Sequence, residues 1–294
     1  MKYSFRPSAA STTPNGDITR HGESCSNEQR RGARAGHGIL TMPQTQPAPT
    51  PPTANDASTF APTSRLRAAI NYGNPVLAQR GLSGEPGGVS VALAKELARR
   101  LAVPLDIVPF DAAGKVVDAL VGDVWDIAFL AIDPLRAEQI AYTAPYVVIE
   151  GTYLVKSDSV LHRIDDFDRA GVRIAVGLGA AYDLYLSRTL KSATLVRTAT
   201  SESAVEDFLR DRLEAVAGVR QPLEQVAASD VSLRVIPGFF TKIQQAMGMP
   251  RHRSAGAAAL HAFVEEMKAS GFVADALRAS GQGNAQVAPP APQA

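Results

Sequence analysis

The stretch from Trp125 to Arg136, WDIAFLAIDPLR, constrains the fold more than any other part of this sequence. Its six consecutive apolar residues, 127–132, are too few to span a membrane, and they stop at an Asp-Pro pair. Such a run is typical of a strand that is buried on both faces, as in a parallel sheet covered by helices. Ligands bind beyond the carboxyl ends of such strands, so Asp133 and Arg136 are candidate site residues.

Strand and helix patterns alternate on both sides of this run. In 87–103, apolar residues recur at helical spacing behind a possible N-cap, Ser90. The expected strands are 104–110, 125–132, 172–177, 193–199, 213–220 and, with the turn that ends it, 66–74. Two longer extended runs are expected at 144–156 and 233–240. The expected helices are 87–103, 112–123, 134–142, 180–190, 201–212 and 257–281. This order predicts an α/β fold with parallel sheets and right-handed crossovers, in two units that the extended runs connect.

Composition excludes several classes of function. The 30 basic and 29 acidic residues give a net charge of +1, which predicts neither a nucleic-acid partner nor an anionic membrane surface. The single cysteine, Cys25, cannot form an internal disulfide, and the five histidines lack metal-ligand spacing. We therefore expect no metal, no other cofactor and no membrane insertion. No catalytic triad or nucleophile elbow is visible either.

Both ends of the chain differ from the middle. Residues 1–64 and 283–294 are poor in aliphatic clusters, so we expect both segments to be disordered. The N-terminus lacks the apolar region of a signal peptide, and Met42 is a second candidate start. The folded part is then about 65–282.

Four segments carry a family resemblance: LRAAINYGNP, GGVSVALAKELARRL, WDIAFLAIDPLRAEQIAYTAPYVVIEGTYLV and RIAVGLGAAYDLYL. In this order they resemble the family 3 solute-binding proteins, the polar-amino-acid-type receptors of ABC importers with the type II periplasmic-binding-protein fold. The resemblance covers essentially all of 65–282. It implies two lobes, each a mostly parallel sheet flanked by helices, joined by two hinge crossings. Lobe 1 would comprise 65–154 and 236–282, and lobe 2 would comprise 155–235.

The resemblance also implies where a ligand binds. Arg136 takes the place of the arginine that grips the ligand carboxylate, which a guanidinium can do with two parallel hydrogen bonds. The turn after the first strand lines the cleft in relatives, and the turn at 177–183 presents backbone N–H groups at a helix start. The expected ligand-binding residues are Asn71, Tyr72, Asn74, Asp133, Arg136, Gly179, Ala181, Tyr182 and Arg220.

The sequence departs from the family where the ligand's ammonium group would bind. Amino-acid receptors usually hold it with an aspartate at the end of a lobe 2 strand, but Gly218 and Val219 stand near that place here, beside Arg220. Either Asp133 or Glu150 supplies another ammonium contact, or the ligand is an acid held by the two arginines.

Structural roles compete with these binding roles. Asp133 precedes a proline and is a good helix N-cap. Arg136 has Asp133 and Glu138 as potential surface partners, and Glu150 suits a structural hydrogen bond in the hinge.

We expect a non-catalytic, monomeric solute-binding protein that captures an amino acid or related organic acid and works with an ABC permease. Two alternatives stay open. One is an intracellular metabolite sensor or scavenger, because no signal peptide is visible. The cytoplasm is then as good a candidate for the location as the periplasm, which the family resemblance implies. A cyclohexadienyl-dehydratase-like enzyme would need an acid, for which Glu150, Glu214, Asp133 and Asp111 are candidates.

Overall fold

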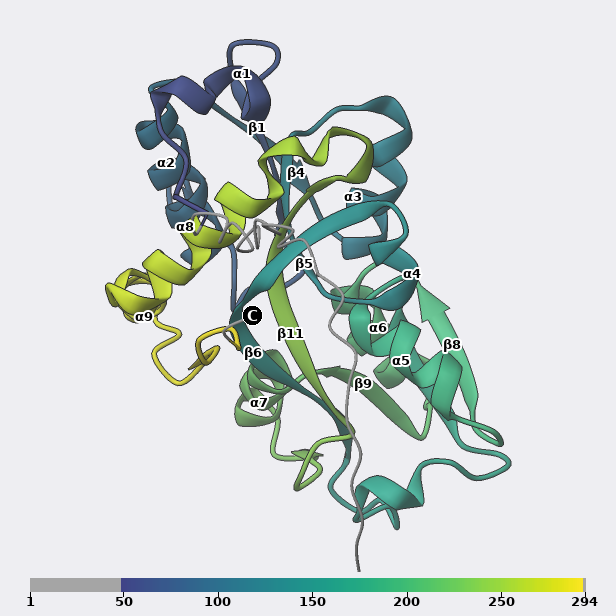
Figure 1. Cartoon of the computed structure of the whole chain (residues 1–294). Helices are drawn as coiled ribbons and strands as arrows, with labels where there is room; N and C mark the ends of the chain where they lie inside the picture. The colour runs from purple at the N-terminus through teal and green to yellow at the C-terminus, as the bar shows by residue number, and fades with distance from the viewer. Residues whose placement is uncertain (1–48, 293–294) are drawn as a thin grey trace, which may run out of the picture. The chain divides into compact units, whose positions relative to one another are not determined.

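The apolar run that ends at Asp133 forms β5 (Ile127–Ala131), and all five residues of this strand are buried. β5 lies between β1 (Leu66–Asn71), which is parallel to it, and β11 (Thr241–Pro250), which is antiparallel. In the computed structural model, which describes residues 49–292, these strands belong to one ten-stranded sheet (Figure 1). The prediction of a buried strand at this place is therefore confirmed.

The sheet has the order β4-β1-β5-β11-β6-β9-β7-β8, and β10 and β12 also pair with β6. Its other strands are β4 (Leu105–Phe110), β6 (Ile140–Lys156), β7 (Arg173–Gly177), β8 (Thr194–Thr198), β9 (Ala215–Val219), β10 (Leu233–Val235) and β12 (Gln286–Val287), while β2 (Gln79–Arg80) and β3 (Pro86–Gly87) form a separate pair. The helices are α1 (Ala57–Phe60), α2 (Val89–Leu101), α3 (Ala113–Asp118), α4 (Pro134–Ala137), α5 (Ala181–Thr189), α6 (Ser201–Arg210), α7 (Arg220–Ser229), α8 (Ala257–Ala269) and α9 (Phe272–Ala279), with 3-10 turns η1 (Ala54–Asp56), η2 (Ala119–Gly122), η3 (Ile164–Asp166) and η4 (Arg251–Gly256).

Two sets of parallel strands confirm the expected α/β architecture. β4, β1 and β5 are the parallel strands of the first lobe, and β8, β7 and β9 are those of the second lobe, at the two ends of the same sheet. In the first lobe, α2 buries Leu93, Leu97 and Leu101 because these residues share one helical face. Its N-cap is Gly88, not Ser90, whose hydroxyl instead lies 3.1 Å from that of Tyr146 inside the core.

Two long strands connect the lobes. Figure 1 shows β6 and β11 side by side, running from the region of β5 toward β9. The second connecting strand was expected at 233–240, but that run forms only β10, and β11 begins after it. Thr, Lys and two Gln residues at 241–245 interrupt the apolar pattern of β11 and conceal a strand whose last six residues are all buried.

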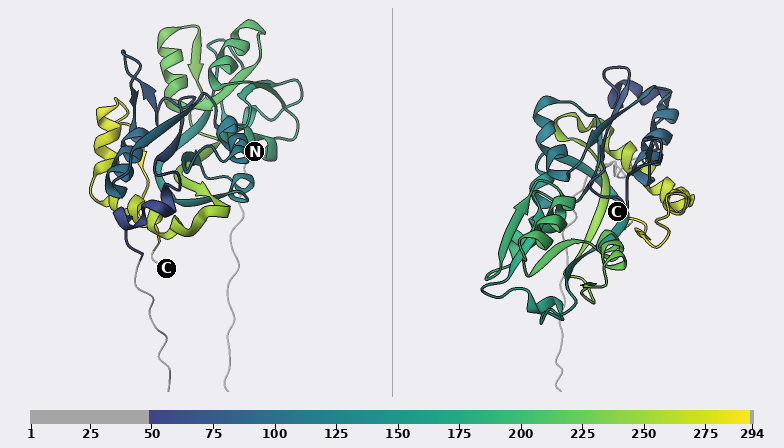
Figure 2. Two further views of the ribbon diagram at one scale, coloured as in Figure 1. Left: turned by 90° about the horizontal axis from the view of Figure 1, so that it is seen from above. Right: turned by 180° about the vertical axis from the view of Figure 1, so that it is seen from behind.

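The chain ends pack more than their composition predicts. Phe60 of α1 is 1% exposed and packs against η4, and β12 pairs with the edge of β6. Disorder was therefore a wrong prediction for residues 54–61 and 285–288, since one buried aromatic and one backbone ladder anchor these short segments. Residues 1–48, with Cys25 and Met42, lie outside the described part of the chain. Figure 2 shows α8 and α9, in yellow, beside α2.

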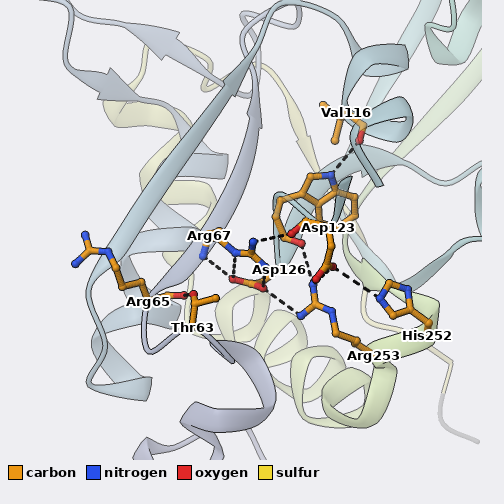
Figure 3. Close-up of polar contacts among 9 residues, drawn as sticks. Thr63, Arg65, Arg67, Val116, Asp123, Asp126, His252 and Arg253 are labelled. Carbon is orange, nitrogen blue, oxygen red and sulfur yellow. Dashed lines mark hydrogen bonds and ion pairs between the residues drawn. The ribbon is translucent and has the colours of Figure 1, made fainter. Parts of the chain in front are cut away.

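A buried charge network holds the start of β5 (Figure 3). The Asp126 carboxylate, 2% exposed, accepts hydrogen bonds from the backbone N–H and the guanidinium of Arg67 in β1. Arg253 of η4 donates to the same carboxylate at 3.1 Å and to that of Asp123 at 2.7 Å. The indole Nε1 of Trp125 donates to the carbonyl oxygen of Val116. These contacts fix the strand at the end opposite to Asp133.

Candidate ligand-binding cleft

Arg136 lies directly after β5, in the single turn of α4. Its side chain is buried, with Nη1 donating to the carbonyl oxygen of Ala131 at 3.1 Å and Nη2 to that of Gly179 at 2.6 Å. Burial lowers the pKa of the Arg136 guanidinium, although an arginine stays charged at neutral pH. Within residues 49–292, no carboxylate forms an ion pair with it. Both hydrogen bonds of the guanidinium go to neutral carbonyl groups. The Tyr142 hydroxyl and the Asp133 carboxylate also raise the pKa of Arg136, but Asp133 forms no ion pair with it.

The guanidinium faces a small cavity, which we call the inner chamber, of about 50 Å³. The polar residues that line it include Asn71, Asn74, Ser90, Thr200, Ser201 and Gln245. Arg136 is the one lining residue with a formal charge. Tyr142, close to Arg136, has a hydroxyl without a hydrogen-bond partner in the described chain, and burial raises its pKa to about 12.

Gln245 was not predicted. It lies on β11 opposite Ala131, next to an irregularity in the pairing of β11 with β6, and is 5% exposed. Gln245 lines the inner chamber, and a buried amide gains free energy from a hydrogen-bond partner. The sequence signal was a glutamine pair inside an otherwise apolar stretch, IQQAMGM, but only the pairing register shows which glutamine points inward.

The second lobe contributes the turn between β7 and α5. Gly179 has a φ of +68°, which favours glycine, and its N–H donates to the Asp183 carboxylate at 2.9 Å. That N–H is therefore not free for a ligand, contrary to the expectation, and it is the Gly179 carbonyl that meets Arg136. Ala181 and Tyr182, at the start of α5, do line the inner chamber. The Tyr182 hydroxyl donates to Ser201, and burial raises its pKa.

A larger cavity, which we call the outer chamber, continues from the inner one. It has a volume of about 730 Å³, and the two chambers share lining residues, among them Asn74 and Tyr182. Tyr72 lines its first-lobe side, whereas α6 and α7 line the opposite side. The Asn74 Oδ1 and the Tyr72 hydroxyl are both buried without a partner in the described chain. Binding roles for Asn71, Tyr72, Asn74, Ala181 and Tyr182 stay predictions, but the structure does bring these residues together.

Two predicted ligand residues lie elsewhere. Asp133 caps α4 by accepting from the Leu135 N–H, and its other oxygen accepts from Arg188 of α5 at 2.8 Å. Arg220 starts α7 and donates to Glu150 of β6 at 2.7 Å. Neither residue lines either chamber. Each pairs with a residue of another element, so the structure does not bring Arg220 into the inner chamber with Arg136. Binding roles for Asp133 and Arg220 stay predictions.

The carboxylates considered for catalysis are similarly placed. Glu150 pairs with Arg220, and Glu214 pairs with Arg173 at 2.9 Å. Asp111 lines the outer chamber and pairs with Lys115 at 2.8 Å. Residues 49–292 contain no group of three His, Cys, Asp or Glu side chains that could hold a metal ion.

A cleft between two α/β lobes, joined by two strands and containing a buried arginine, defines a two-lobed binding protein. The family model of bacterial extracellular solute-binding proteins, family 3, matches residues 66–279, and the chain belongs to this family. Comparison with curated proteins gave no match. No helix in the described part of the chain could span a membrane.

Solved structures show the same fold at low sequence identity. A mutant of ArgBP from T. maritima is 21% identical, with 76% of this chain and 98% of that chain covered and a TM-score of 0.67. A putative ABC transporter binding component from Wolinella succinogenes, complexed with lysine, is 20% identical over 74% and 95% of the chains, with a TM-score of 0.64. An ancestral amino acid-binding protein, a precursor of cyclohexadienyl dehydratase, is 20% identical over 76% and 98%, with a TM-score of 0.65.

Proposed function

We propose that this protein captures a small carboxylate-bearing metabolite, an amino acid or a related organic acid, between its lobes. The observation that carries the proposal is the buried Arg136 guanidinium, which faces the inner chamber without a carboxylate partner in the described chain. A buried charge without a counter-charge costs free energy, and a ligand carboxylate would supply the counter-charge through charge-assisted hydrogen bonds.

Lobe closure is the expected mechanism. Arg136 contacts Gly179, and Asp133 contacts Arg188, so both pairs join the first lobe to the second. A ligand that touches both lobes binds the closed arrangement better than an open one and shifts the population toward closure. Solved structures of the same fold with arginine or lysine bound support this kind of ligand.

We infer binding without chemistry. A general acid must reach the group that it protonates. Of the four candidates, Glu150, Glu214 and Asp133 pair with arginines outside both chambers. Asp111, which lines the outer chamber, pairs with Lys115. Delivery to an ABC permease outside the cytoplasm is the role that family membership supports. Fractionation of the native host tests it, since a pool confined to the cytosol would favour the sensor or scavenger instead.

Calorimetry on the full chain tests the proposed ligand class. Each acid in a panel of amino acids, keto acids and dicarboxylates is compared with its primary amide, which has nearly the same shape but no negative charge. We expect at least one acid to bind and its amide to bind about a hundredfold more weakly or not at all. Equal affinity of acid and amide would contradict the role of Arg136.

A further inference from the structure

The two chambers carry opposite charges. Arg136 is the one formally charged residue that lines the inner chamber, whereas the charged residues that line the outer chamber are Asp111, Glu202 and Glu206. Glu202 and Glu206 are four residues apart on α6, so they lie on the same helical face. Neither forms an ion pair within residues 49–292, whereas Asp111 pairs with Lys115. The cleft is therefore positive inside and negative outside.

This polarity determines where a ligand's positive group is stabilised. The ammonium of an α-amino acid is attached next to the carboxylate, so it would lie in the inner chamber close to Arg136. No carboxylate lines that chamber, and the residue of β9 that lines it is Val219. A like charge without a counter-charge is unfavourable there. A cation several bonds away from the carboxylate would instead reach the carboxylates of the outer chamber.

Two neutral amide side chains, those of Gln245 and Asn74, also line the chambers. Gln245 lines the inner chamber and is 5% exposed. Asn74 lines both chambers and is 9% exposed, and its Oδ1 has no partner in the described chain. Neutral amides can bind either oxygen or nitrogen groups of a ligand, so they supply hydrogen bonds without requiring an α-ammonium. The unsatisfied Oδ1 of Asn74, together with Gln245 on the wall of the inner chamber, marks the path between the chambers as a ligand site.

We propose that the ligand is an extended carboxylate whose essential positive charge is distal: the carboxylate binds Arg136 and Gln245, and an amine or guanidine binds near Glu202 and Glu206. The proposal rests on the proposed function and adds that the α-amine contributes little. Glu202 and Glu206 then determine the specificity for a distal positive group, whereas Arg136 determines whether any acid binds.

Four six-carbon acids form a complete test series. Lysine carries both amines, 6-aminohexanoate lacks the α-amine, norleucine lacks the terminal amine, and hexanoate lacks both. Titration of the full chain should show about a tenfold loss when the terminal amine is removed, and less than about a threefold loss when the α-amine is removed. The reverse order, with norleucine stronger than 6-aminohexanoate, would overturn the proposal.

Variants separate this proposal from the underlying function. Glu202→Gln/Glu206→Gln should abolish the preference for 6-aminohexanoate over hexanoate, while hexanoate still binds. The control is Asp158→Asn/Asp165→Asn, which removes the same charge from two exposed residues that line neither chamber. A preference that survives in the glutamine variant overturns the inference alone, provided that binding still requires Arg136. Failure of all four acids and of the wider acid panel overturns both proposals.

Discussion

Arg136 donates a hydrogen bond to the carbonyl oxygen of Gly179 at 2.6 Å, which joins α4, the helical turn that follows β5, to the turn after β7. The backbones meet closely at the same place, because a Cβ on Gly179 would lie 3.0 Å from the Cα of Gly114 in α3. A Cβ on Gly114 would lie 3.2 Å from the carbonyl oxygen of Leu178. The two glycines therefore allow the lobes to approach each other at the inner chamber.

Gly114→Ala should weaken ligand binding by about tenfold without lowering the melting temperature. The added methyl group hinders closure, whereas alanine is favoured over glycine in a helix. Calorimetry and thermal unfolding measure the two effects separately. Gly179→Ala is the comparison, because its φ of +68° should also destabilise the protein by about 1 kcal/mol. An unchanged affinity in Gly114→Ala would argue against the close approach.

Asp133→Ala should lower the free energy of unfolding by about 1–2 kcal/mol, because it removes the cap of α4 and the ion pair with Arg188. Asp133→Asn keeps an oxygen for the cap and should lose less. Urea unfolding of both variants checks this order. If both variants instead lost ligand binding while remaining fully stable, Asp133 would be a ligand residue after all.

Much of the fold could be predicted from local patterns. The apolar run of β5 and the helical spacing of α2 depend on residues that are close in sequence, and both predictions are confirmed. β11 was missed because polar residues, two of them exposed, interrupt the apolar pattern in its first half. α7 was missed although Pro222 suits a first helical turn.

The site was harder to predict because it depends on pairing between distant segments. Asp133 and Arg220 have suitable side chains for a ligand contact. In the structure, however, Asp133 pairs with Arg188, and Arg220 pairs with Glu150. Gln245 has no recognisable motif, and only the register of β11 against β5 brings it to the inner chamber. The spacing of residues along the chain shows neither which distant residues form ion pairs nor how two distant strands are aligned.

Asp126→Ala should destabilise the protein by about 3–5 kcal/mol, because Arg67 and Arg253 would lose a buried counter-charge. Asp106→Ala is a matched control. Asp106 of β4 pairs with Arg65, the residue before β1, and this ion pair lies at the surface. Its effect should be much smaller. Chemical unfolding of the two variants measures the difference, and similar losses would mean that burial of the network in Figure 3 is not what matters.

The Glu96 carboxyl should account for part of the loss of folding stability at low pH. Hydrogen bonds from Arg99, and then from Arg100, lower the pKa of the Glu96 carboxyl from 4.5 to about 2. A folded-state pKa below the unfolded value stabilises the protein above about pH 4.5, and the contribution is lost as the pH falls toward 2. Glu96→Gln should therefore reduce the loss of stability between pH 5 and pH 2, as measured by urea unfolding at each pH. An identical pH profile for both proteins would exclude this contribution.

Calorimetry of Arg136→Ala with the best-binding acid measures directly whether Arg136 holds the ligand's carboxylate. Arg210→Ala, at an exposed arginine of α6 that lines neither chamber, is the control for loss of one positive charge. We predict that Arg136→Ala weakens binding by at least about a hundredfold while remaining folded, and that Arg210→Ala binds like the unmodified protein. A folded Arg136→Ala variant with unchanged affinity would contradict the account.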